Sequence, residues 1–217
     1  PAAIHLTYVD AQLARYNTVA AKSALQDLKN KSMPKEILGR VALLEGTYLM
    51  GEDEAKAILL INQAIKNGLS QADEFYAKAL LNPEPLKALE LYQKALERDS
   101  RHLQARSMTS ILLVILGRHQ DAIDMAKVTT VLYPDHPNAD AVQFLAFALQ
   151  GNDKDAEKKL ALLRNRMPDP VVLAFEEAMP HLLNWQRAFI VSTHGDFAQH
   201  YPAYQAYLKK YGQITRL

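Results

Sequence analysis

Histidine is the residue type that first suggests chemistry in this sequence, because imidazoles grouped with carboxylates can bind zinc. Of the seven histidines, His194 and His200 lie close together around Asp196, on a segment that we expect to be a loop. A zinc site at this spacing also needs second-shell partners that hold each imidazole, and none is evident. We therefore expect these side chains to be solvated, and we predict no metal ion and no cofactor.

No arrangement of residues typical of an active site is present either. The sequence contains no nucleotide-binding loop, nucleophile elbow or HExxH pattern, and its eight glycines do not cluster. Glu176 and Glu177 are adjacent, so on a helix they would point roughly 100° apart and could not act as a carboxylate pair. Cysteine is absent, which excludes disulfides, thiolate metal ligands and a cysteine nucleophile. The sequence therefore predicts a protein that is not an enzyme.

Net charge and hydropathy limit the kinds of partner that the chain is expected to bind. Lys plus Arg number 25 and Asp plus Glu 24, so the net charge of +1 leaves no basic excess to bind nucleic acid or an anionic membrane. The longest apolar run, residues 111–116, is far shorter than the roughly 20 residues of a membrane span. Because 49% of the residues are hydrophobic, we expect a folded chain. We expect a cytoplasmic location, although the cysteine-free composition fits the periplasm as well.

A repeat with a period of 34 residues runs through the middle of the chain. Segments 88–95, 122–129 and 156–163 align without gaps, and each begins with alanine (Ala88, Ala122 and Ala156). A fourth copy, 57–64, lies 31 residues earlier, which indicates that about one helical turn is missing near residues 82–85. Apolar residues recur at three- and four-residue spacing, as in amphipathic helices. No strand-like alternation is visible.

The breaks between helices repeat as well. Gly117 and Gly151 can take the positive φ that ends a helix, whereas Pro134 and Pro168 cannot continue one. Each unit is therefore predicted to be a helix, a glycine turn, a second helix and a proline turn. This order places His102 and His136 at one end of the hairpins and His119 at the other. These three histidines cannot converge on a metal ion.

These features resemble the tetratricopeptide repeat (TPR) family, whose units are helix–turn–helix hairpins of about 34 residues. Residues 87–99, KALELYQKALERD, resemble a TPR second helix almost residue for residue. The small residue early in this helix lets the two helices of a hairpin pack closely. The first-helix glycine of the family is replaced here, and so is the large aromatic residue one turn before it. The glycine position is held by Leu44, Ser110 and Phe144. The aromatic position is held by Arg40, Arg106 and Asp140.

The resemblance implies an all-α solenoid of antiparallel helix hairpins with a right-handed superhelical twist. We expect a degenerate N-terminal hairpin in residues 1–34, with helices at 6–15 and 18–29. About four TPR-like repeats would follow in residues 35–170, and a C-terminal helical cap in residues 171–217. Terminal units must cover an otherwise exposed apolar face, so the repeat is expected to fade there.

The resemblance also implies a partner-binding surface, because the first helices of TPR hairpins line a concave groove. Carried over by position, this groove comprises Gln104, Ser107, Ile111, Val114, Asn138, Ala141, Leu145 and Ala148. It is largely apolar and uncharged, so we expect it to bind an apolar or amphipathic segment of a partner protein or peptide. These two helices carry a single Lys or Arg residue, Arg106, so we do not expect a clamp that grips the C-terminal carboxylate of a partner. Alternatively, the apolar groove residues are core, or the chain's own C-terminal helix covers them.

Four tyrosines near the end of the chain recur at helical spacing, namely Tyr201, Tyr204, Tyr207 and Tyr211. We expect them to belong to a capping helix, although such a stripe is also typical of an interface, including a homodimer contact. Residues 196–212 resemble the closing segment of TPR-type regions in bacterial transcription activators and adenylate cyclases. The alternative function is therefore a regulatory, signal-input or self-assembly domain of a larger regulator.

Overall fold

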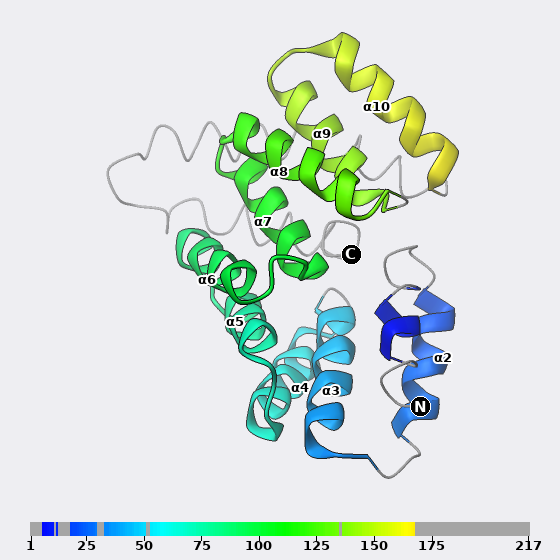
Figure 1. Ribbon diagram of the computed structural model, residues 1–217, viewed down its shortest axis with the longest axis vertical. Helices are drawn as coiled ribbons and strands as arrows, with labels where there is room; N and C mark the ends of the chain where they lie inside the picture. The colour runs from blue at the N-terminus through cyan, green and yellow to red at the C-terminus, as the bar shows by residue number, and fades with distance from the viewer. Residues whose placement is uncertain are drawn as a thin grey trace. The chain divides into compact units, whose positions relative to one another are not determined.

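The computed structural model describes residues 6–10, 12, 18–29, 33–50, 53–134 and 136–167, and all regular structure within them is α-helical (Figure 1). The expected C-terminal cap with its four tyrosines lies outside these residues. The chain divides into two compact units, the first ending at Ala105 and the second beginning at Arg106. Among the described helices, none is long and apolar enough to cross a bilayer.

The helices follow one another through short turns. They are α2 (Thr18–Lys29), α3 (Lys35–Leu49), α4 (Glu54–Asn67), α5 (Gln71–Leu80), α6 (Pro85–Arg98), α7 (Leu103–Ile115), α8 (His119–Leu132), α9 (Asn138–Leu149) and α10 (Asp153–Arg166). Residues 6–10 form a further helical turn before α2. The boundary between the two units falls inside α7. The first helix of the second repeat, α5, has 10 residues where α7 has 13, which accounts for the shorter spacing of the alanines there.

The predicted helix hairpins are present in both units. Helix α3 packs along α4 and α5 along α6 in the first unit, and α9 packs along α10 in the second. The recurring alanine of each second helix is buried at Ala57, Ala88, Ala122 and Ala156. A larger side chain at these positions would hold the two helices apart. The recurring alanines in the sequence therefore mark the places where the helices of each hairpin are in close contact.

Close packing in the first hairpin also depends on a glycine that the family pattern did not identify. A Cβ atom added to Gly46 would lie 2.6 Å from Cγ1 of Ile61 and 3.1 Å from the carbonyl oxygen of Ala57. The small residue of α3 that meets the recurring alanine of α4 is therefore Gly46, two positions after Leu44, which holds the expected glycine position. Helices α3 and α4 are therefore closest where Gly46 of α3 meets the backbone of Ala57 in α4.

The helix ends show how local sequence sets the hairpin boundaries. The Asp53 carboxylate accepts a hydrogen bond from the Lys56 amide at 3.1 Å and so caps α4. Gly117 and Gly151 have φ values of +76° and +72°, which confirms the predicted glycine turns. Pro85 is the first residue of α6, where its missing N–H is tolerated.

The N-terminal region packs on α3 through an apolar cluster. Its buried members are Leu6, Val9, Ala21, Ala24, Leu25, Leu28, Val41 and Leu44. Helix α2 matches the expected helix at 18–29. The apolar side chains of the helical turn at 6–10, of α2 and of α3 thus share one core within the first unit.

Candidate partner-binding surface

The predicted groove residues lie on α7 and α9. Gln104 belongs to the first unit and the other seven belong to the second unit. Ser107, Ile111, Val114, Asn138, Ala141 and Leu145 are all buried, with exposed fractions of 3% or less. Gln104 and Ala148 are half-buried. In this structure the predicted groove is therefore not an open surface.

Helix α9 carries little charge toward this surface. Every residue of α9 from Asn138 to Ala146 is buried, including its one charged residue, Asp140. The Asp140 carboxylate accepts hydrogen bonds from Lys159 and Arg166 of α10, each at 3.0 Å. The charge of Asp140 is therefore compensated within its own hairpin, and the other residues of α9 are uncharged and mostly apolar.

Unmatched polar atoms accompany this apolar surface. The Ser107 hydroxyl, the Asn138 side-chain oxygen and both ring nitrogens of His136 are buried without a hydrogen-bond partner in the part of the chain that the structure describes. Burial lowers the pKa of His136 to about 4, so the ring is neutral at pH 7. Each unmatched buried polar group costs on the order of 1–3 kcal/mol. A hydrogen-bonding partner for these atoms would recover that energy.

The equivalent positions one repeat earlier are all satisfied. Asp73, His102 and Gln104 each lie 34 residues before Ser107, His136 and Asn138 respectively. Nε2 of His102 lies 3.2 Å from Oδ1 of Asp73, and Gln104 donates a 2.8 Å hydrogen bond to Asp10. The first unit therefore supplies the kind of hydrogen-bond partner that Ser107, His136 and Asn138 do not have among the described residues.

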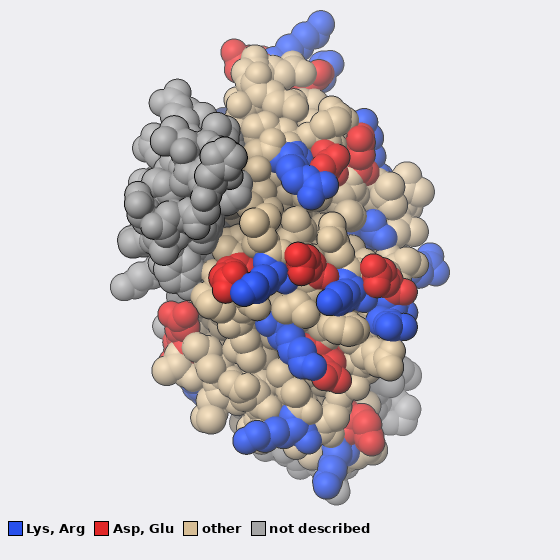
Figure 2. Space-filling view, turned by 90° about the vertical axis from the view of Figure 1, so that its left-hand side faces the viewer, with Lys and Arg blue, Asp and Glu red and all other residues tan. Residues whose placement is uncertain are grey.

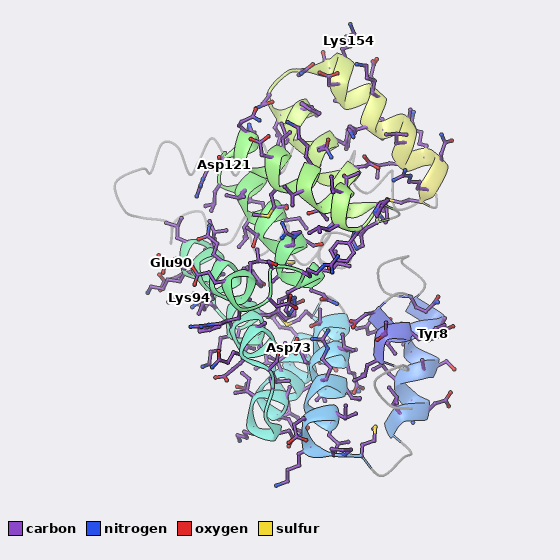
Figure 3. All side chains as sticks on the ribbon, viewed as in Figure 1. Tyr8, Asp73, Glu90, Lys94, Asp121 and Lys154 are labelled. Carbon is purple, nitrogen blue, oxygen red and sulfur yellow. The ribbon has the colours of Figure 1, made fainter. Side chains whose placement is uncertain are left out.

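Arg40 is at the centre of the polar network in the first unit. Its guanidinium pairs with Asp73 of α5 and, at 3.2 Å, with Asp10 of the helical turn before α2. Figure 3 shows Asp73 on the side of α5 that faces α3. The sequence pattern gave Arg40 no role beyond replacing an aromatic residue. The one feature of the sequence that could have indicated the Arg40–Asp73 pair is the spacing of the two residues, which is close to the repeat period.

The contact between His102 and Asp73 is a neutral hydrogen bond at pH 7. Burial, and then the charge of Arg40, lowers the pKa of His102 to about 4. Nδ1 of His102 accepts the amide hydrogen of Ala105 at 3.2 Å, so the ring proton is on Nε2 and is donated to Asp73. Within the described ranges, no three His, Asp or Glu side chains gather as metal ligands.

Charges on the outer surfaces of both units are mixed in sign. Figure 2 shows lysine and arginine interspersed with aspartate and glutamate over the visible face. Exposed pairs one helical turn apart account for part of this pattern, for example Lys87 with Glu84 and Lys127 with Asp124. No large surface of one sign is visible on this face, so it offers nothing that favours nucleic acid.

A pocket missed by the sequence pattern lies between α2 and α3 in the first unit. It has a volume of about 490 Å³ and is lined by Lys22, Ser23, Leu25, Gln26, Glu45, Tyr48, Leu49 and Lys56. The ammonium group of Lys22 lies 4.3 Å from the ring centroid of Tyr48, within the range of a cation–π contact. No predicted groove residue contributes to this pocket.

The repeated placement of the alanines shows that the hairpins follow one common pattern. They are buried at the same point of successive second helices, within paired helices whose sequence period is 34 residues. The paired helices are TPR-like in their arrangement. No protein-family model matches the sequence, and no curated protein matches it significantly. Among solved structures, the chain is similar to YrrB, described as a TPR protein with an unusual peptide-binding site. That similarity covers 79% of this chain and 89% of YrrB, with 19% sequence identity and a TM-score of 0.47.

Proposed function

We propose that this protein is a TPR-like, non-enzymatic scaffold that binds an apolar or amphipathic segment of a partner polypeptide. The proposed contact surface is the predicted groove on α7 and α9. One observation carries the proposal: apolar side chains such as Ile111 and Leu145 share these helices with unmatched polar atoms of Ser107 and Asn138. Mainly apolar surfaces with a few polar groups are typical of ligand sites.

The chemistry of these helices favours recognition through apolar side chains and the peptide backbone. The Asp140 charge is compensated by α10, so a charged partner residue has little to pair with on α9. The unmatched Asn138 oxygen can accept a backbone N–H, and the Ser107 hydroxyl can donate to a backbone carbonyl. An amphipathic helix or a short extended segment could make these contacts.

The burial of these residues also fits a role as core, so the test must separate binding from stability. We expect Asn138→Leu with Ser107→Ala to leave the free energy of unfolding equal or to raise it by about 1–2 kcal/mol, because unmatched polar atoms are removed. Capture of partner polypeptides from native lysate, with cross-links mapped to residues 103–115 and 138–149, should fall at least about tenfold.

Thr47 provides a matched control for this experiment. Its hydroxyl is also buried without a partner among the described residues, but it lies on α3 in the first unit. Thr47→Ala should therefore leave capture unchanged. If the double variant at Ser107 and Asn138 gains stability and captures partners as well as the unaltered chain does, these residues are core and the groove proposal fails.

The alternative function is a regulatory, signal-input or self-assembly domain of a larger bacterial regulator. The supporting observation is the resemblance of residues 196–212 to the closing segment of such proteins. Light scattering on the full chain and on a variant with Tyr204 and Tyr207 changed to serine would test self-assembly. A monomer in both cases would remove the self-assembly form of this alternative.

A further inference from the structure

The helical turn at residues 6–10, called here the N-terminal turn, packs on the first unit with one face. Leu6 and Val9, three residues apart, are buried in the apolar cluster with α2 and α3. Tyr8 lies on the opposite side and points away from α3 (Figure 3), with 48% of its surface exposed. The turn is therefore a short amphipathic segment seated on the repeats.

The next residue, Asp10, connects two first helices. Its carboxylate accepts hydrogen bonds from Nη2 of Arg40 on α3 at 3.2 Å and from Nε2 of Gln104 on α7 at 2.8 Å. Helices α4, α5 and α6 separate α3 from α7 in the chain. One carboxylate therefore bridges side chains of two different repeats, as a bound ligand would.

Arg40 does not depend on Asp10 for its charge to be compensated. Its guanidinium also pairs with Asp73, which is itself held by His102 and by the Ser70 hydroxyl. If Asp10 left, Arg40 would keep one carboxylate, and Asp10 could return to water, since its side chain is already 28% exposed. The departure of Asp10 would leave no buried charge without a partner, so replacing Asp10 by another carboxylate costs little free energy.

We propose that the N-terminal turn is a built-in occupant of a carboxylate-binding site formed by Arg40 and Gln104. The external ligand of this site is a helical partner segment with apolar residues at positions i and i+3, directly followed by Asp or Glu. Its carboxylate replaces Asp10, and its apolar side chains replace Leu6 and Val9. This inference rests on the proposed function, because it names the partner chemistry that the first unit of the scaffold would recognise.

The turn competes with any such partner from within the same chain. A tethered competitor acts at an effective concentration that reaches the millimolar range for short tethers, so it weakens partner binding without changing the site. A substitution that weakens the contacts of Asp10 should therefore make the site available to a partner. A partner segment with the same apolar residues but no acidic residue should gain little affinity from such a substitution.

The test uses a fluorescent synthetic peptide with the sequence of residues 1–12, added to the full chain and followed by anisotropy. We expect it to bind Asp10→Asn at least about tenfold more tightly than the unaltered chain, because a charge-assisted contact in the tethered turn is lost. Asp10→Glu, which keeps the carboxylate, and Asp27→Asn, which removes an exposed charge on α2, should bind it as the unaltered chain does. Adding Arg40→Gln to Asp10→Asn should abolish binding.

A second peptide with Asn in place of its aspartate should bind none of these variants. Three outcomes would overturn the inference: equal peptide binding by Asp10→Asn and the unaltered chain, equal binding of the two peptides, or a dimer of Asp10→Asn in light scattering. The last would mean that two copies exchange turns. Circular dichroism shows whether Asp10→Asn is folded. If it is not, Val9→Ala replaces it, because this variant weakens the apolar contact of the turn and leaves both Arg40 and Gln104 in place.

Failure here is distinguishable from failure of the proposed function. The peptide assay reports on the first unit alone, and Ser107→Ala with Asn138→Leu should not change it. If lysate capture persists in Asp10→Asn but this variant binds the peptide no more tightly than the unaltered chain does, the scaffold proposal survives and the inference about the N-terminal turn is wrong.

Discussion

Two equivalent histidines, His102 and His136, are buried and neutral at pH 7, and their surroundings differ. His102 donates to Asp73, whereas His136 has no hydrogen-bond partner among the described residues. Burial is the main cause of the lowered pKa, about 4, in both cases. The shared pKa therefore follows from the position in the repeat rather than from a particular neighbour.

This lowered pKa predicts a loss of stability in mild acid. In the unfolded chain each histidine binds a proton below about pH 6.5, whereas the folded chain binds it only near pH 4. Between these values the unfolded state holds more protons, so the free energy of unfolding falls as the pH falls through this window. The loss should be complete near pH 4 and on the order of 3 kcal/mol per histidine.

The measurement is urea unfolding at pH 7.0 and pH 4.5. His136→Phe should reduce the difference between the two pH values, because this side chain does not titrate. His119→Gln serves as the control, since His119 lies at the opposite hairpin turn and is less buried. An unchanged pH dependence in His136→Phe would show that His136 titrates normally in the folded chain.

At the scale of helices, the contact between α3 and α4 depends on Gly46. Alanine is the better helix former by about 1 kcal/mol, so helix propensity alone would make Gly46→Ala stabilising. The added Cβ would instead meet Ile61 and the backbone oxygen of Ala57. We expect a net loss of about 1–3 kcal/mol in the free energy of unfolding, as for other overpacked cores.

Thr47→Ala, at the next residue of α3, is the control because it also introduces alanine but adds no atom to the contact with α4. It removes a buried hydroxyl that lacks a partner among the described residues. It should unfold at equal or higher urea concentration than the unaltered chain. If Gly46→Ala were also stabilising, α3 and α4 would have room to separate, and the glycine-against-alanine contact would not limit their packing.

The sequence pattern predicted the hairpins well because close helix contacts and helix ends demand particular residue types. Ala88, Ala122, Gly117 and Gly151 each leave a visible signal for this reason. Gly46 was missed because a close approach can move two positions along a helix when the neighbouring side chains adjust. Which turn carries the small residue depends on packing between helices.

At the scale of the whole molecule, the polar contacts were beyond the reach of the sequence pattern. Asp10 and Gln104 are 94 residues apart, and their contact depends on how successive hairpins curve within the first unit. The composition of the groove on α7 and α9 could be predicted, but the sequence left open whether its residues are exposed or core, because periodicity does not show what covers a helix. The partner-binding role of these residues stays a prediction.

The bond between Asp10 and Gln104 has a consequence for how the first unit folds. Repeat arrays are held by contacts between neighbours, so their ends can unzip one repeat at a time. A bond that joins the start of this unit to α7 opposes such fraying, because opening either end breaks it. We expect amide hydrogens of α2 and α6 to exchange through one shared opening event. In Asp10→Asn, those of α2 should exchange first.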